Sequence, residues 1–289
     1  DIPAWPQFPR RSFRESMYVQ FSVGLPNVVV DKERERLFFD TAADLTTPLA
    51  AFYERYIAED VNSFALQPEY AAGFYTMLDV LHRTEGEWAK GQVTGPISFG
   101  LTATDQDLRP VLYHETLADA IIKGAAMNAR WQVKQLRTVR PNVILFVDEP
   151  YMASFGSAYI NLTREGVIEM LDEVFDAIHA EGALAGVHCC ANTDWSVLLG
   201  TTIDILNLDA YGYLENLALY PSELRAFLER GGVIAWGIVP NNEEIAHVTP
   251  ESIIKRLYEG FSLISEKAKR RGVQIAPEEF IRRSLITPS

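Results

Sequence analysis

The chain has 289 residues, enough to bury a sizeable core in one large α/β domain or in two smaller ones. Of these residues, 48% are hydrophobic, and the formal net charge is −13. This acidity excludes a general binder of the phosphate backbone, which would carry a basic face, so we expect no nucleic-acid partner. No apolar run reaches the roughly 18 residues that a membrane-spanning helix needs, so we expect no membrane partner.

Cysteine usage indicates a reducing compartment. The chain has two cysteines, Cys189 and Cys190, and adjacent cysteines cannot readily pair with each other. A disulfide framework is therefore excluded, and the start of the sequence shows no secretory signal. We expect a cytoplasmic protein.

The first third of the chain has its own pattern. Two apolar runs flank a charged turn within residues 28–39, which predicts a hairpin. Residues 44–60 and 68–83 then place apolar side chains at helical spacing. We interpret this stretch as a hairpin-plus-helices insertion, around residues 13–83, in a single domain that covers residues 1–289. Two alternative roles stay open for this insertion, a lid over a site and a docking surface for a partner.

From Gln92 onward, near-continuous apolar strands alternate with amphipathic helices, which indicates a parallel sheet covered on both faces. Seven candidate strands start at Ile2, Gln92, Asn142, Leu184, Ile203, Val233 and Ser284. The strand from Gln92 is predicted to run to Leu101. Helices are predicted over residues 117–137, 163–180, 221–230 and 250–271, with a short one from Asp194.

An eighth strand, expected before Asp1, would complete a (β/α)8 TIM barrel, and we predict this fold with its first strand missing from the given chain. The rival fold is an open, doubly wound sheet. Such sheets usually carry a glycine-rich phosphate loop after the first strand, but neither GxGxxG nor GxxxxGK[ST] occurs in this sequence.

Polar residues follow the predicted strands. A TIM barrel carries its active site where the carboxyl ends of its strands meet, so these residues are candidates for one site. They are Asp148, Glu149, His188, Cys190, Asn192, Asp209, Tyr211, Asn241 and Asn242. An acid after a strand is also often a helix cap, which is the structural alternative for Glu149 and for Asp194.

A His-x-Cys pair at a strand end supplies half of a tetrahedral metal site. Because side chains alternate along a strand, His188 and Cys190 point the same way, while Cys189 faces the helix layer as a small buried hydrophobe. Zinc takes imidazole and thiolate ligands, and catalytic zinc sites use about three protein ligands and one open position. Asp209, at the same height on the next strand, is the best candidate for the third ligand.

The segments around these residues resemble a known family. Gly186–Thr193 (GVHCCANT) and Ile203–Asp209 (IDILNLD) are similar to the HxCxNT…aDilslD signature of the uroporphyrinogen decarboxylase and cobalamin-independent methionine synthase superfamily. The match leans towards its zinc thiol methyltransferases, including the methylcobalamin:coenzyme M enzymes. Gly95–Ser98 resembles their GP-x-[ST] strand, and Asp148–Pro150 resembles the DEP segment of methionine synthase. The resemblance runs from Gln92 to the end of the chain.

The resemblance implies zinc bound by His188 and Cys190, often with a carboxylate from the sixth strand, here Asp209. It also implies a second cysteine just after the eighth strand, which we expect beyond Ser289, and a Gly-Ser strand for the substrate carboxylate before the start of this sequence. Asp148 would hold the amine of an amino-acid thiol. Asp209 stands where methionine synthase has a glutamate, as in the decarboxylase and coenzyme M branches.

The expected function is zinc-dependent transfer of a methyl group from a corrinoid or folate donor to a small thiol that resembles homocysteine or coenzyme M. Asp148 and Asp209 are the candidate catalytic residues, and Asp148, Glu149, Asn192 and Tyr211 are the candidate substrate-binding residues. Partners would be the thiol and a corrinoid protein or methylcobalamin. Two alternatives are a decarboxylase resembling uroporphyrinogen decarboxylase, against which the acidity and the His-x-Cys pair argue, and a non-catalytic accessory protein that handles corrinoid or methyl groups.

Overall fold

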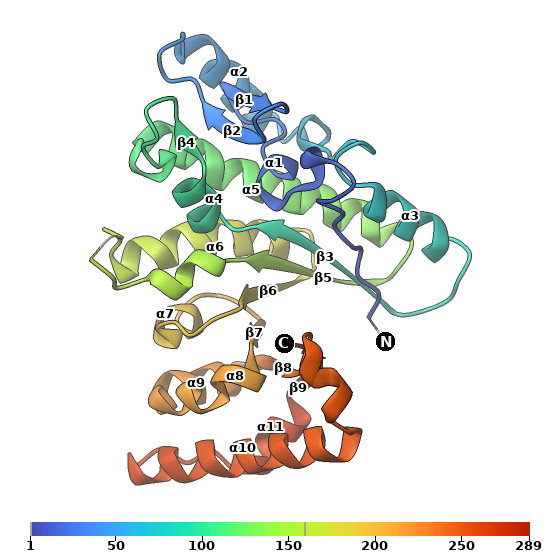
Figure 1. The fold of residues 1–289 in the computed structure, drawn as a ribbon, viewed down its shortest axis with the longest axis vertical. Coiled ribbons are helices and arrows are strands. Elements are labelled where there is room, and N and C mark those ends of the chain that lie inside the picture. Colours follow the sequence, from blue (N-terminus) through green and yellow to red (C-terminus); the bar gives the residue numbers. More distant parts are fainter. Residues whose placement is uncertain (1, 159) are drawn as a thin grey trace. The chain divides into compact units, whose positions relative to one another are not determined.

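The computed structural model describes residues 2–158 and 160–289 and shows an α/β protein (Figure 1). Its main sheet has six parallel strands in the order β3-β5-β6-β7-β8-β9. These are β3 (Trp88–Thr94), β5 (Asn142–Asp148), β6 (Leu184–Cys189), β7 (Ile205–Leu208), β8 (Val233–Val239) and β9 (Ser284–Pro288). Six strands in this order are consistent with part of a TIM barrel, which requires eight.

Three helices precede β3, and the later helices lie between the strands of the main sheet as predicted. The helices are α1 (Met17–Gln20), α2 (Thr46–Ile57), α3 (Ala72–Leu81), α4 (Pro96–Thr102), α5 (Glu115–Arg137), α6 (Arg164–Ala180), α7 (Trp195–Leu199), α8 (Ala210–Tyr213), α9 (Pro221–Glu229), α10 (Pro250–Arg270) and α11 (Pro277–Arg282). The predictions for α5, α6, α7, α9 and α10 are confirmed, and each predicted helix end lies within two residues of the observed end. No helix in the part of the chain that the structure describes is both long and apolar enough to cross a membrane.

The strand predicted from Ile2 is wrong in extent. Ala4 forms a single parallel bridge with Lys90 of β3, and the backbone amide of Lys90 donates to the carbonyl of Pro3 at 2.8 Å. Pro3 and Pro6 flank the bridge, and proline has no N–H to donate to a strand ladder. The segment therefore lies alongside β3 without extending into a strand.

Tertiary contacts divide the chain into two compact units. Unit 1 comprises Asp1–Glu149 and Glu169–Ala185, and unit 2 comprises Pro150–Ile168 and Gly186–Ser289. Unit 1 contains β3 and β5 with their covering helix α5, and unit 2 contains β7, β8 and β9. Strand β6 begins in unit 1 and ends in unit 2.

The predicted hairpin and the two helices that follow it are confirmed in unit 1. Strands β1 (Val28–Asp31) and β2 (Arg36–Phe39) pair antiparallel, and the short strand β4 (Thr104–Asp105) adds to β2 in parallel. Phe39, Phe99 and Leu117 belong to one buried apolar cluster, which packs β2 against α4 and α5. Burial of this cluster holds the hairpin on the rest of unit 1.

The strand predicted from Gln92 to Leu101 is wrong in its second half, because residues 96–102 form helix α4. Gly95 is the N-cap and Pro96 the first helical residue. The amides of Ile97 and Ser98 donate to the two carboxylate oxygens of Glu149 at 3.0 and 2.8 Å, and the Ser98 hydroxyl adds a third bond at 2.6 Å. A buried acid 51 residues away from Ser98 thus caps this helix.

Unit 2 is built around Trp236 of β8. The Trp236 ring packs against Phe261 of α10 at 5.2 Å between ring centroids and against Phe280 of α11 at 6.0 Å. Its indole N–H donates to the hydroxyl of Ser284 on β9 at 2.7 Å. One side chain therefore joins two strands and two helices, with its polar atom satisfied.

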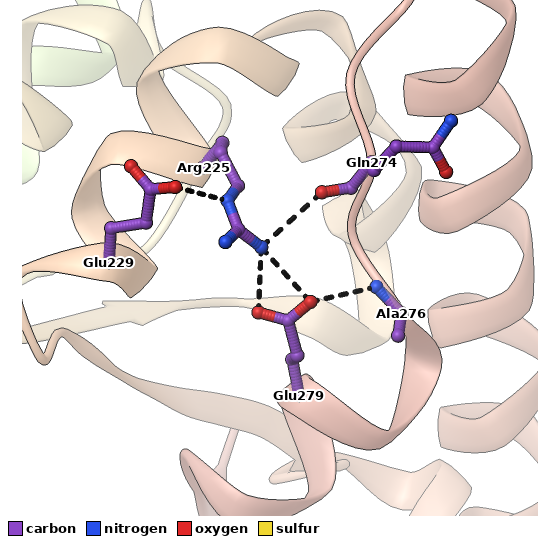
Figure 2. Close-up of polar contacts among 5 residues, drawn as sticks. All are labelled: Arg225, Glu229, Gln274, Ala276 and Glu279. Atoms are coloured by element: carbon purple, nitrogen blue, oxygen red, sulfur yellow. Dashed lines mark hydrogen bonds and ion pairs between the residues drawn. The ribbon is translucent and has the colours of Figure 1, made fainter.

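An ion-pair network ties α9 to α11 (Figure 2). Arg225 Nη1 lies 2.8 Å from Glu279 Oε2, and Arg225 Nε lies 2.8 Å from Glu229 Oε1. Glu279 also accepts the backbone amide of Ala276 at 3.1 Å, so it caps its own helix. The network lines a surface cavity of about 690 Å³. Because two carboxylates already bind Arg225, we assign this cavity a structural role.

The cap on α4 predicts an energetic coupling between Gly95 and Glu149. A Cβ at residue 95 would overlap the Glu149 carboxylate, which is buried and cannot swing away. We expect Gly95→Ala to lower the free energy of unfolding by about 3 kcal/mol, and by less than about 1 kcal/mol when Glu149 is already alanine. Denaturant unfolding of the two single variants and the double variant measures this coupling.

Ser98→Ala is the matched control, since it removes one hydroxyl donor and leaves both backbone donors in place. It should lower the free energy of unfolding by about 1 kcal/mol. Additive effects of Gly95→Ala and Glu149→Ala would contradict the proposed contact.

Candidate functional site

His188, near the end of β6, is the centre of a polar group on the sheet of unit 2. Its Nδ1 lies 2.6 Å from Oδ1 of Asn207, the residue directly opposite it on β7. The Asn207 amide nitrogen donates to the carbonyl of Ala235 on β8 at 2.7 Å and to the hydroxyl of Thr287 on β9 at 3.0 Å. His188 is half-buried, and this network fixes one edge of its ring.

The two cysteines lie in different environments. Cys189 is fully buried, with its thiol 3.4 Å from the carbonyl of Ala191, as predicted for a side chain that faces the helix layer. Cys190 follows the last residue of β6 and is exposed, and neither cysteine is in a disulfide. Only Cys190 therefore presents its thiol at the surface of unit 2, where a metal or a reagent can reach it.

Asp209 comes directly after β7 and begins α8. Its Oδ1 accepts the backbone amide of Gly212 at 2.9 Å and the hydroxyl of Ser289 at 2.9 Å. Ser289 is held in place because its amide donates to the carbonyl of Val239 at 2.8 Å and its carbonyl accepts from the side chain of Asn241. The carboxyl ends of β7, β8 and β9 thus meet at the Asp209 carboxylate.

The other two residues predicted to contact substrate in unit 2 are less closely tied to this group. Asn192 is exposed in the loop after β6. Tyr211 packs under the Arg256 guanidinium, 4.1 Å from the ring centroid, and its carbonyl accepts from Arg256 at 2.6 Å. A hydrogen bond to Glu244 raises the pKa of the Tyr211 phenol. Tyr211 lines a cavity of about 530 Å³ with Arg256, and its contact with substrate stays a prediction.

Asp148 and Glu149 belong to unit 1. Asp148 ends β5, is half-buried, and accepts the backbone amide of Gly95 through its carbonyl at 2.9 Å. Glu149 is fully buried, and both of its oxygens are occupied by α4. Glu149 is therefore a helix cap, as the structural alternative predicted. The roles predicted for Asp148 and Glu149 towards substrate stay predictions.

The capping alternative also holds for Asp194 and extends to Asn242. Asp194 Oδ1 accepts the amide of Ser196 at 3.0 Å and its hydroxyl at 2.6 Å, which begins α7. Asn242 accepts the amide of Glu244 at 2.9 Å at the start of a 3-10 helix, Glu243–His247. Several of the polar residues after strands are thus helix caps.

Sequence reasoning missed Lys90, which lies in the middle of β3. Its ammonium stands 4.7 Å from the Phe146 ring centroid and 3.5 Å from the side-chain oxygen of Gln92. Burial lowers the pKa of Lys90, and the charge of Asp148 opposes that shift. The sequence signal for Lys90 was a lysine within a mostly buried strand, where burying a charge is costly unless the charge has partners.

The donor set of unit 2 can be compared with the zinc site that the sequence predicts. Imidazole, thiolate and carboxylate are zinc ligands in kind, and His188, Cys190 and Asp209 supply one of each. Within residues 2–158 and 160–289, no group of three or more His, Cys, Asp or Glu side chains is arranged to hold a metal ion. The sequence matches no protein-family model, and no curated protein is significantly similar to it.

The burial of Glu149 predicts a pH dependence of stability. Burial raises the pKa of Glu149 from its ordinary 4.5 to about 7, although hydrogen bonds from Ser98 and Ile97 oppose the shift. Between these values the folded chain keeps a proton that the unfolded chain has lost, so stability falls as pH rises from about 4.5 to about 7 and is level above. The total loss is on the order of 3 kcal/mol.

Denaturant unfolding of the natural chain and of Glu149→Gln, compared at each pH, isolates this contribution because the other titrating groups cancel. The natural chain should lose stability relative to the variant as pH rises through this window. A flat or rising difference would mean that the three hydrogen bonds keep Glu149 ionised throughout.

Proposed function

We propose that this chain is a zinc-dependent methyltransferase, which moves a methyl group from a corrinoid or folate donor to a small thiol. The observation that carries the proposal is the 2.6 Å hydrogen bond between His188 Nδ1 and Asn207 Oδ1, beside an exposed Cys190 at the end of the same strand. A histidine that ligates a metal through one ring nitrogen commonly donates the other N–H to an oxygen, which fixes the ring.

Asp209 supports the proposal as a third ligand. Both hydrogen bonds to its carboxylate go to Oδ1, and among the described residues no hydrogen bond to Oδ2 is present. A carboxylate can bind a metal through one oxygen while the other caps a helix. We propose His188 Nε2, the Cys190 thiolate and Asp209 Oδ2 as the ligand atoms. Because no three such side chains among the described residues are already arranged to hold an ion, zinc binding would have to bring these three together.

Bound zinc would supply a Lewis acid that lets a coordinated thiol lose its proton at neutral pH. In the overall transfer the thiol proton is released, a sulfur–methyl bond forms and the donor–methyl bond breaks. The electron pair of the broken bond stays with the cobalt of a corrinoid or with the folate nitrogen, which takes up a proton. The chain itself would orient the ligands through Asn207 and Ser289.

The first prediction for this site concerns metal content. The natural chain, purified and exposed to zinc, should retain about one zinc per chain by elemental analysis, because catalytic zinc sites are built to hold one ion. Cys190→Ala and His188→Ala should each lose it. Cys189→Ala is the matched control: its thiol is buried against the helix layer, so the variant should keep its zinc.

Activity then tests the reaction. The zinc-loaded chain should form an S-methyl product from methylcobalamin or methyltetrahydrofolate with homocysteine or coenzyme M, and Cys190→Ala should not. Absence of zinc from the natural chain, or loss of zinc from Cys189→Ala but not from Cys190→Ala, would contradict the proposal. Zinc binding without any S-methyl product would instead support a non-catalytic accessory protein.

A second prediction concerns Asp209. If its carboxylate is a ligand, Asp209→Asn should weaken zinc binding by more than roughly 100-fold, since even loss of a residue that only supports a ligand costs 10 to 100-fold. Ser289→Ala removes a hydrogen bond to Oδ1 and leaves Oδ2 in place, so it should have a smaller effect. Competition with a chromogenic zinc chelator measures both affinities. Equal affinities for the two variants would exclude Asp209 as a ligand.

A further inference from the structure

The side chain of Lys90 extends along the sheet of unit 1 towards the carboxyl end of β3. Side chains alternate along a strand, so Lys90, Gln92 and Thr94 lie on one face of β3. The Lys90 ammonium lies 3.5 Å from the side-chain oxygen of Gln92 and 4.7 Å from the ring centroid of Phe146. Phe146 is the residue opposite Gln92 on β5. The amine therefore reaches the level of the Gln92–Phe146 pair, on the way to Asp148.

The surroundings of this amine contain few groups that stabilise a positive charge. Phe146 and Gln92 are both buried, and the side-chain nitrogen of Gln92 donates to the carbonyl of Trp5 at 3.0 Å, which leaves its oxygen facing Lys90. Within residues 2–158 and 160–289, Lys90 makes no ion pair, although the charge of Asp148 favours the ammonium. Burial lowers the pKa of Lys90 despite this charge.

Lys123 of α5 shows how another lysine of unit 1 is accommodated away from solvent. Its ammonium lies 2.6 Å from the carboxylate of Asp119 and 3.1 Å from that of Glu173. Burial acts against the charge here too, but the hydrogen bonds and charges of the two acids outweigh burial and raise the pKa of Lys123. Lys90 has no such ion pair. Its position is therefore costly for a charge and favours the neutral amine.

We infer that Lys90 is a nucleophilic amine, which forms an imine with a small aldehyde or ketone on this face of the unit 1 sheet. Lys90 and Asp148 are both half-buried, so neither side chain is sealed from solvent. Desolvation without an ion pair is one way in which proteins prepare a lysine for attack on a carbonyl carbon. The inference does not rest on the proposed function, because no residue that supports it is a proposed zinc ligand.

Imine formation at Lys90 needs no oxidant or reductant. The neutral Nζ attacks the carbonyl carbon, a nitrogen–carbon bond forms, and the electron pair of the carbonyl π bond moves to the oxygen, which takes up a proton. The carbon–oxygen bond then breaks, water leaves, and the carbon–nitrogen double bond forms. Overall, the ammonium and the carbonyl compound give a protonated imine and one water molecule. The Phe146 ring, which keeps water from one side of Nζ, favours the neutral amine that begins this step.

Trapping of the imine tests the inference directly. The natural chain is incubated near neutral pH with a low concentration of glycolaldehyde and with sodium cyanoborohydride, which reduces each imine to a stable secondary amine. Peptide mass spectrometry then locates the adducts. Lys90 should carry most of the adduct, ahead of Lys123 and ahead of Lys255, whose side chain is 76% exposed. Lys90→Met should lose this adduct, and Lys123→Met is the matched control that should keep it.

Stability gives the second readout, because a purely structural role for Lys90 predicts a different result. If the cation–π contact with Phe146 were its purpose, Lys90→Met would remove a stabilising contact and lower the denaturant midpoint. If the amine is kept for reaction, its burial is a cost to the fold. Lys90→Met, which has an unbranched and uncharged side chain, should then leave the midpoint unchanged or raise it.

The adduct map of the natural chain decides the question without any variant. Adduct that is distributed by side-chain exposure, with Lys255 ahead of Lys90, would overturn the inference. An unmodified Lys90 together with a lower midpoint for Lys90→Met would assign the lysine to the fold alone. Should Lys90→Met fail to fold, Lys90→Arg keeps the positive charge, forms no imine and should also lose the adduct. Zinc content enters none of these outcomes, so the proposed function and this inference can fail separately.

Discussion

The parallel register of β6 and β7 is the constraint on which the candidate site depends. It places His188 opposite Asn207 and, through β8, aligns Asn207 with Ala235. Side chains alternate along a strand, so a shift of one residue would replace Asn207 by Leu206 or Leu208 and remove the acceptor for His188. The apolar residues of β7 that face the helix layer are fully buried and fix the register. Hydrophobic burial on one face therefore sets the polar geometry on the other.

Polar residues after strands have two roles in this protein, and residue type alone does not separate them. Glu149 and Asp194 each satisfy the amides at the start of a helix, and Asp209 does the same for α8. A helix that starts soon after a strand needs such acceptors, so acids at these places are expected whether or not the protein has a site. His188 and Cys190 are different, because neither imidazole nor thiol is a usual cap. His188 and Cys190 therefore support the proposed function more strongly than the acids do.

Elements that depend on neighbouring residues in the sequence were predicted correctly. Elements and contacts that depend on residues far away in the sequence were missed. Strands β5 and β8 are runs of apolar residues, and α10 has an amphipathic pattern. Composition and spacing were therefore enough to predict these elements. Helix α4 was missed because its cap, Glu149, lies 51 residues away from Ser98. The role of Asn207 was missed for the same reason, since its three partners are 19, 28 and 80 residues away. Register and topology create such pairs, and one sequence alone does not specify them.

The two oriented ligand candidates share one arrangement. In His188, Nδ1 lies 2.6 Å from the side-chain oxygen of Asn207, and Nε2 is the ligand atom that we propose. In Asp209, Oδ1 accepts the two structural bonds and Oδ2 is the other oxygen. A side chain with two potential ligand atoms can be anchored through one and bind a metal through the other, so anchoring does not compete with binding. Such anchoring reduces the entropy that a metal would have to remove from these two side chains, while among residues 2–158 and 160–289 no three such side chains are already arranged to hold an ion.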